Sequence, residues 1–265
     1  MSRTLNPGEK NTQLVYEYDR GSPYEEELRL TAALSALIPD DETRHPDHRF
    51  FQVVHLITEY SWAQIHYELR RSVEHLENGR YVAALRLMDR CTSLNEISVR
   101  AVESLKDFLP QHSLLTMRNE LPPDATGLDS PGHRNLRRVA KYVWKVFEEA
   151  MRREQVSLRA LLEMQNDSTP AAEKDPSGVV HTMAALRESM LRLDASVLAW
   201  KQSHLRLVWS QLGGHPGLTK QDSQAGSSLP TSLGGRPISV METRSEMALF
   251  PALWQAADEL YHEVS

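Results

Sequence analysis

The chain has 265 residues, of which 40% are hydrophobic and 25% are charged, so it is long enough to bury a core and too apolar for a disordered chain. It has 30 Lys and Arg residues against 36 Asp and Glu residues, and the resulting net charge of −6 disfavours nucleic-acid binding, which depends on neutralising phosphates. The single cysteine, Cys91, excludes intramolecular disulfides, a zinc site built from cysteines and a C-x-x-C-H attachment motif.

No stretch of the sequence approaches the ~18 apolar residues that cross a membrane. The N-terminal residues also lack the apolar segment of a secretory signal. We therefore expect one domain over residues 1–265, located in the cytoplasm and bound to neither membrane nor nucleic acid. Residues 1–23 form its N-terminal arm in this prediction.

From about residue 24 the apolar residues recur at intervals of three and four, which is the helical period. The pattern predicts an all-α, single-domain helical bundle. Its helices are expected over residues 49–74, 81–108, 135–166, 179–212 and 251–263. Pro46 and Asp47 predict the start of the first helix, and Asn78-Gly79 predicts its end because this pair suits a left-handed cap.

The predicted helices have distinct apolar and polar faces. In the first helix, Glu59 and Glu68 are expected on the solvent side with Arg70 and Arg71. In the third helix, Tyr142 is expected on the buried side. The polar segment over residues 167–177, which holds two prolines, is expected to be an exposed connection.

Residues 213–240 depart from the helical pattern, because residues 213–235 alone hold six of the twelve glycines. A loop this long inside a compact domain is uncommon and is usually either functional or disordered. Two interpretations stay open at this point: a lid over an active site, and an unstructured insertion.

Two histidines lie on apolar helix faces. His55 follows Phe51 by one turn in the first helix, and His204 follows Trp200 by one turn in the fourth. Two long helices that point histidines into one core could flank a planar haem, with one imidazole ligating the iron and the other lining the opposite side. The commoner role for such a histidine is a core residue that is hydrogen-bonded to a backbone carbonyl. Periodicity alone does not decide between the two.

Four segments resemble, in the same order, the motifs of the tryptophan 2,3-dioxygenase family. The run FQVVHLITEYSW at residues 51–62 is similar to the family's F-x-x-x-H-Q-x-x-E-L-W, and YEEELRL at residues 24–30 to its Y-x-x-Y-L-x-L. MRNEL at residues 117–121 with TGLDS at residues 126–130 resembles F-R-x-x-L followed by S-G-F-Q-S. WKQSH at residues 200–204 resembles the W-x-x-x-H that carries the proximal haem ligand.

The resemblance implies a helical oxygenase with a b-type haem between two long helices, which acts with dioxygen on an indole amino acid. It implies His204 as the proximal iron ligand and His55 as the catalytic histidine beside the indole nitrogen. Phe51 would pack on the indole, and Arg118 would bind the substrate carboxylate, a role that suits its planar guanidinium.

The resemblance also implies a homo-oligomer, a dimer or tetramer, with exchanged N-terminal segments. Tyr24 and Leu28 would then cover the substrate pocket of a neighbouring subunit. Gly127 would lie in a loop that closely approaches haem and substrate, where the absence of a Cβ atom matters.

The sequence departs from the family on the substrate side. The family's G-T-G-G-[ST] loop is missing after the proximal histidine, and Thr219 is the nearest candidate for its threonine. Ser113 or Leu114 stands where the family has a tyrosine. Because the histidines are retained, we expect oxygen insertion with a changed outcome, favouring monooxygenation of tryptophan or a β-methyltryptophan to a 2-oxindole in natural-product biosynthesis. The alternatives are ring opening to N-formylkynurenine, hydroxylation of tyrosine at C3, and a non-catalytic haem-binding sensor.

Overall fold

The computed structural model describes residues 4–18, 20–122, 127–164, 175, 177–215, 217, 231–232 and 235–264. Across these residues every regular element is a helix, and the only bridge of β type pairs Thr231 with Pro237. The predicted all-α class is confirmed. None of the helices in these ranges is long and apolar enough to cross a membrane.

The helices of the described residues differ widely in length. Two single 3₁₀ turns cover Asp40–Glu42 and Gly127–Asp129. The α-helices are α1 (Pro23–Leu28), α2 (Leu30–Leu34), α3 (His48–Glu77), α4 (Tyr81–Phe108), α5 (Gln111–Glu120), α6 (Pro131–Arg153), α7 (Leu158–Glu163), α9 (Val179–Leu212), α10 (Ile238–Ser245) and α11 (Pro251–Val264).

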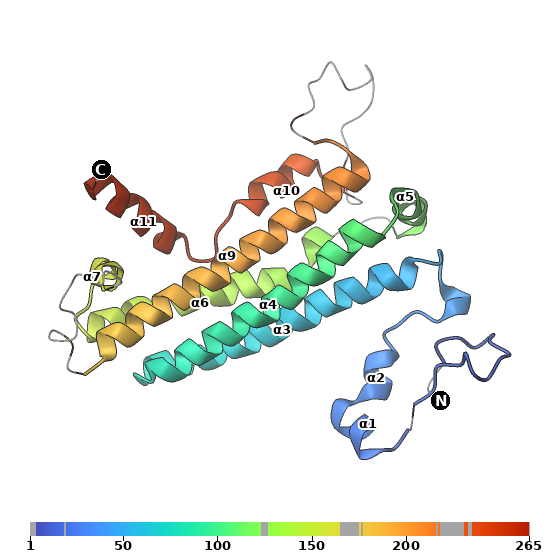
Figure 1. Cartoon of the computed structure of the whole chain (residues 1–265), viewed down its shortest axis with the longest axis horizontal. Helices are drawn as coiled ribbons and strands as arrows, with labels where there is room; N and C mark the ends of the chain where they lie inside the picture. The colour runs from blue at the N-terminus through green and yellow to red at the C-terminus, as the bar shows by residue number, and fades with distance from the viewer. Residues whose placement is uncertain are drawn as a thin grey trace.

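The long helices α3, α4, α6 and α9 form the body of the molecule (Figure 1). Helix α4 packs against α3 on one side and α9 on the other, and α6 packs against α3. The turn between α3 and α4 is tight because Gly79 takes a φ of +69°, a left-handed conformation that glycine adopts without steric cost. Helices α1 and α2 lie beside the bundle, toward the start of α3 (Figure 1).

The core consists of two apolar clusters. The larger one joins α3, α4, α6 and α9 around Trp62 and Phe147, which are fully buried. The smaller one includes Val54, Leu105 and Leu207. Trp200 packs against both clusters. The region around Trp200 is therefore where the two halves of the core meet.

The predicted third helix, over residues 135–166, is wrong as a single element. Helix α6 begins earlier, at Pro131, and ends at Arg153. Gln155 then takes a φ of +55°, and the Ser157 side chain accepts a hydrogen bond from the Ala160 N–H, which starts α7. The serine cap therefore starts a new helix where the apolar period continues.

Other expectations need smaller corrections. Glu68 is not on a solvent face: it is 1% exposed and paired with Arg71 and Arg90 at 2.8 and 3.0 Å. Tyr142 is 50% exposed rather than buried. The predicted loop over residues 213–240 runs into α10, which begins at Ile238. Most of that loop, and most of the connection predicted over residues 167–177, lie outside the described residues.

Candidate functional site

Three adjoining cavities lie between α3 and α9, near the first turn of α6. Gly127 and His204 line all three. We name them by one residue that lines each: the Thr58 cavity of about 1120 Å³, the Arg118 cavity of about 870 Å³ and the Arg244 cavity of about 510 Å³.

His55 lines both the Thr58 and the Arg118 cavities. Its Nδ1–H donates to the Phe51 carbonyl at 2.7 Å, which leaves Nε2 as the unprotonated nitrogen. The Phe51 ring lies 4.2 Å from the imidazole, centroid to centroid. The His55 side chain is accessible because the cavities open onto it. The protein around it nevertheless desolvates the charged form, which lowers the pKa of this imidazole. Nδ1 thus makes the backbone hydrogen bond that is typical of a core histidine, while Nε2 is free to accept a hydrogen bond from another group.

His204 faces His55 from α9. Its ring stacks on Trp200 with the centroids 5.1 Å apart and the planes 13° from parallel. Burial, with His55 and His133 nearby, lowers the pKa of His204 to about 4, so the imidazole is neutral at pH 7. It makes no hydrogen bond within the described part of the chain. A neutral imidazole without a partner is the form that binds a metal ion.

Arg118 and Gly127 also line the cavities, as the family resemblance implies. The Arg118 Nη2 donates to the Thr231 carbonyl at 2.6 Å, and the other N–H groups of the guanidinium are left for other partners. Ser232 lines the same cavity beside Leu114. A residue of the glycine- and serine-rich loop therefore does reach this cavity.

Two predicted site residues, Tyr24 and Leu28, do not line the cavities of this chain, and a third cannot be placed. Tyr24 and Leu28 lie on α1 and are 69% and 52% exposed. Thr219 lies outside the described residues. The described part of the loop brings Thr231 and Ser232 to the Arg118 cavity.

A carboxylate on α3 fixes the start of α6 beside the cavities. Glu59 accepts a hydrogen bond from the Gly132 N–H at 3.0 Å and another from the Ser130 hydroxyl. A Cβ atom on Gly132 would lie 2.6 Å from a Glu59 oxygen and 3.0 Å from Trp62, so only glycine fits there without a shift. This contact sets the position of His133 one residue later.

A buried carboxylate on α9 holds the segment between α10 and α11. Asp194 accepts hydrogen bonds from the backbone N–H groups of Leu249 and Phe250 at 2.7 and 2.8 Å, and from the Trp254 indole at 3.1 Å. Two turns later on the same helix, the Lys201 ammonium donates to the Met247 carbonyl. Helix α10, which forms one wall of the Arg244 cavity, is fixed by these contacts.

The sequence prediction missed four cavity residues: His133, Lys201, Met241 and Arg244. For His133 a signal existed, because it lies three residues before the buried Leu136 on the same face of α6. The two cationic residues carried no such signal, because a charged side chain in a helix is ordinarily on the solvent side.

Within the described residues no group of three or more histidine, cysteine or acidic side chains is placed to hold a metal ion. A centre ligated by His204 alone would be of another type, in which a bound macrocycle supplies the other ligands. No protein-family model matches the chain, and no curated protein matches its sequence.

Proposed function

We propose that this protein is a haem-dependent oxygenase that inserts oxygen from dioxygen at the indole C2–C3 bond of tryptophan or a β-methyltryptophan. The observation that carries the proposal is the pair His55 and His204, which line the same cavities from α3 and α9. Both have lowered pKa values because the surrounding protein desolvates their charged forms. This agrees with the roles that the motif resemblance assigns to them.

The cavity lining fits a b-type haem. It is mostly apolar and aromatic, with Trp62, Trp200 and Leu205 around His204. Cationic side chains, Arg118 and Arg244, lie in two of the cavities, where carboxylates of a bound group would be stabilised. His204 would be the protein ligand of the iron, and the haem would supply the activation of dioxygen that amino-acid side chains do not provide.

The residues of this chain would bind and orient the substrate. Nε2 of His55 is the free acceptor toward which the indole N–H would point, and the Phe51 ring would pack on the indole face. The Arg118 guanidinium would pair with the substrate carboxylate from the other end of the same cavity. These contacts lower the barrier by positioning the reacting carbons, and His55 need not remove the indole proton.

The favoured outcome is a 2-oxindole, with one oxygen atom inserted. This assignment rests on the departures from the family motif around Arg118, where Leu114 and Ser232 line the cavity. The two outcomes differ in stoichiometry. Inserting one atom sends the other to water and takes two electrons and two protons from a reductant, whereas ring-opening dioxygenation inserts both atoms and needs no reductant.

Product mass under isotopically labelled dioxygen tests the proposal. The haem-loaded, reduced protein is offered tryptophan, β-methyltryptophan and tyrosine. One labelled atom in an indole product supports the monooxygenase, and two would mean ring opening. A hydroxylated tyrosine as the only product would replace the indole assignment, and haem binding with no product from any of the three would contradict the enzyme proposal.

Arg118 gives a second test of substrate binding. Replacing Arg118 with Leu should collapse the binding of a carboxylated substrate and leave haem binding in place, because in the proposed site this arginine binds the substrate and is not a ligand of the iron. Unchanged substrate binding would favour a haem-binding module without a carboxylate site.

A further inference from the structure

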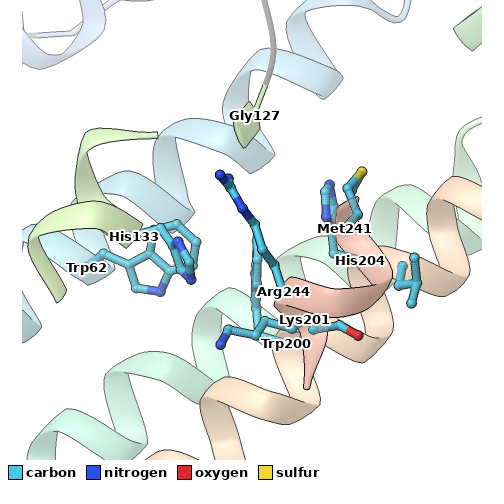
Figure 2. Close-up of a pocket in the computed structure, with 10 residues that line it drawn as sticks. Trp62, Gly127, His133, Trp200, Lys201, His204, Met241 and Arg244 are labelled. Atoms are coloured by element: carbon cyan, nitrogen blue, oxygen red, sulfur yellow. The ribbon is translucent and has the colours of Figure 1, made fainter. Parts of the chain in front are cut away.

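The Arg244 cavity is lined mainly by aromatic and cationic side chains. It is bounded by Trp62 and His133 on one side and by His204 and Met241 on the other (Figure 2). The Arg244 side chain extends from α10 into the space between them (Figure 2). The substrate-binding roles proposed above fall to residues of the other two cavities, and which carboxylate Arg244 binds is left open.

Two polar atoms in this lining have no hydrogen-bond partner within the described residues. They are Nε1 of Trp200 and Nε2 of His133, and both are buried. The indole N–H of Trp200 can only donate, so only an acceptor can satisfy it. A buried polar group without a partner is costly, which indicates that something else supplies that acceptor.

The cavity is also cationic. The Arg244 guanidinium makes no ion pair or hydrogen bond in the described part of the chain, and Lys201 donates to the Met247 carbonyl. None of the residues described in its lining is acidic. Burial and the charges of Lys201, Arg137 and Arg244 lower the pKa of His133 to about 4, so it is a neutral imidazole that can also donate. The unpartnered donors in this lining can be satisfied by an acceptor, and a negatively charged acceptor would also pair with Arg244.

We propose that the Arg244 cavity is a carboxylate-binding subsite, in which Arg244, the Trp200 indole and His133 bind the carboxylate of a planar ligand that lies against His204. It is separate from the Arg118 cavity. The carboxylate could come from a propionate of the haem, in which case the inference rests on the proposed function, or from a free aromatic acid, in which case it does not. Both sources present the same chemistry to the same three side chains.

Binding to the haem-free, full-length protein tests the subsite. The probes are ferric protoporphyrin IX and its dimethyl ester, and indole-3-propionate and its methyl ester, followed by quenching of tryptophan fluorescence. The variant is Arg244→Leu, and the matched control is Arg206→Leu, the same change at an exposed position of α9. We expect Arg244→Leu to weaken the binding of one acid by about ten- to a hundredfold, because hydrogen bonds to charged groups contribute that much.

The two sources give different results. Weaker binding of the porphyrin acid alone identifies a haem propionate, and weaker binding of indole-3-propionate alone identifies a free carboxylate ligand. In either case the ester should bind wild type and variant equally. An equal loss for acid and ester, or no loss for either acid, overturns the proposal.

Further controls separate this inference from the proposed function and from misfolding. If the wild type binds no porphyrin, the haem proposal fails, and the indole-3-propionate pair decides the subsite alone; binding of neither acid overturns both. Arg244→Lys keeps the charge and should restore most of the affinity lost in Arg244→Leu. A loss of the same size in Arg244→Lys, with a native melting curve, would contradict a role for the charge.

Discussion

At the scale of single residues, His133 is an imidazole kept neutral by its surroundings. Its ring lies 5.6 Å from that of Trp62, and its pKa falls from 6.5 to about 4. Between these two values the unfolded chain binds a proton that the folded chain does not. The contribution of this residue to stability is therefore complete above pH 6.5 and is lost as the pH falls toward 4.

Haem-free protein should accordingly lose stability on acidification by up to about 1.4 kcal/mol per pH unit through His133. His133→Phe keeps an aromatic ring beside Trp62 and cannot be protonated. Its denaturation midpoint should therefore change less between pH 6.5 and pH 4.5 than the midpoint of the wild type. His112→Phe, the same change at an exposed position of α5, should leave the wild-type slope intact. If the denaturation midpoints of all three proteins changed equally with pH, His133 would not be kept neutral by its surroundings.

Substitutions of His55 and His204 should separate haem retention from catalysis. His204→Ala should abolish the Soret band after reconstitution, because it removes the proposed iron ligand. His55→Ala should retain the haem and slow turnover or change the ratio of products. A normal Soret band in the purified His204→Ala protein would remove the ligand assignment.

At the scale of elements, the Glu59 contact determines where α6 begins. Glu59→Ala leaves the Gly132 N–H and the Ser130 hydroxyl without their acceptor, so we expect a loss of about 1–3 kcal/mol in the free energy of unfolding. The control is Glu74→Ala in the same helix, where the partner Arg80 is exposed and the cost should stay below about 1 kcal/mol. Urea denaturation measures both. Equal costs would contradict a role for Glu59 beyond that of a surface charge.

The sequence predicted the long elements well because they are governed by local period. The expected bounds 81–108 and 179–212 coincide with those of α4 and α9, and α3 ends at Glu77, before Asn78-Gly79 as predicted. The period could not reveal the break before α7, which depends on the Ser157 cap. It also misplaced Glu68, whose burial depends on Arg90 of another helix. The cavity positions of Lys201 and Arg244 were not predicted for the same reason, because the residues around them come from distant parts of the chain.

At the scale of the whole molecule, the segment that precedes α3 exposes apolar side chains beside the bundle. Tyr24 and Leu28 are exposed on α1, while Arg49 of α3 holds this segment by donating to the carbonyls of Leu5 and Ile38 at 2.8 and 2.9 Å. An exposed pair of this kind is what the proposed exchange of N-terminal segments between subunits would cover.

We therefore expect the full-length chain to sediment as a dimer or tetramer at micromolar concentration. The double change Tyr24→Ser and Leu28→Ser should shift it toward the monomer, because it removes the apolar surface that the exchange would bury. A double change of exposed residues elsewhere, Val82→Ser with Ile97→Ser on α4, is the control. A monomeric wild type would contradict the proposed assembly.

The contact between Trp62 and Trp200 makes the cavity visible to spectroscopy. Their rings meet edge to face with centroids 4.6 Å apart, close enough for the electronic transitions of the two indoles to couple. Such a pair should give a signed doublet in the far-ultraviolet circular dichroism spectrum, where the strongest indole transition lies, and neither indole gives this doublet alone. Trp200→Phe should erase it, and a ligand that wedges between α3 and α9 should change its amplitude. Ligand binding at this site can thus be followed by the circular dichroism of the protein itself, without an added label.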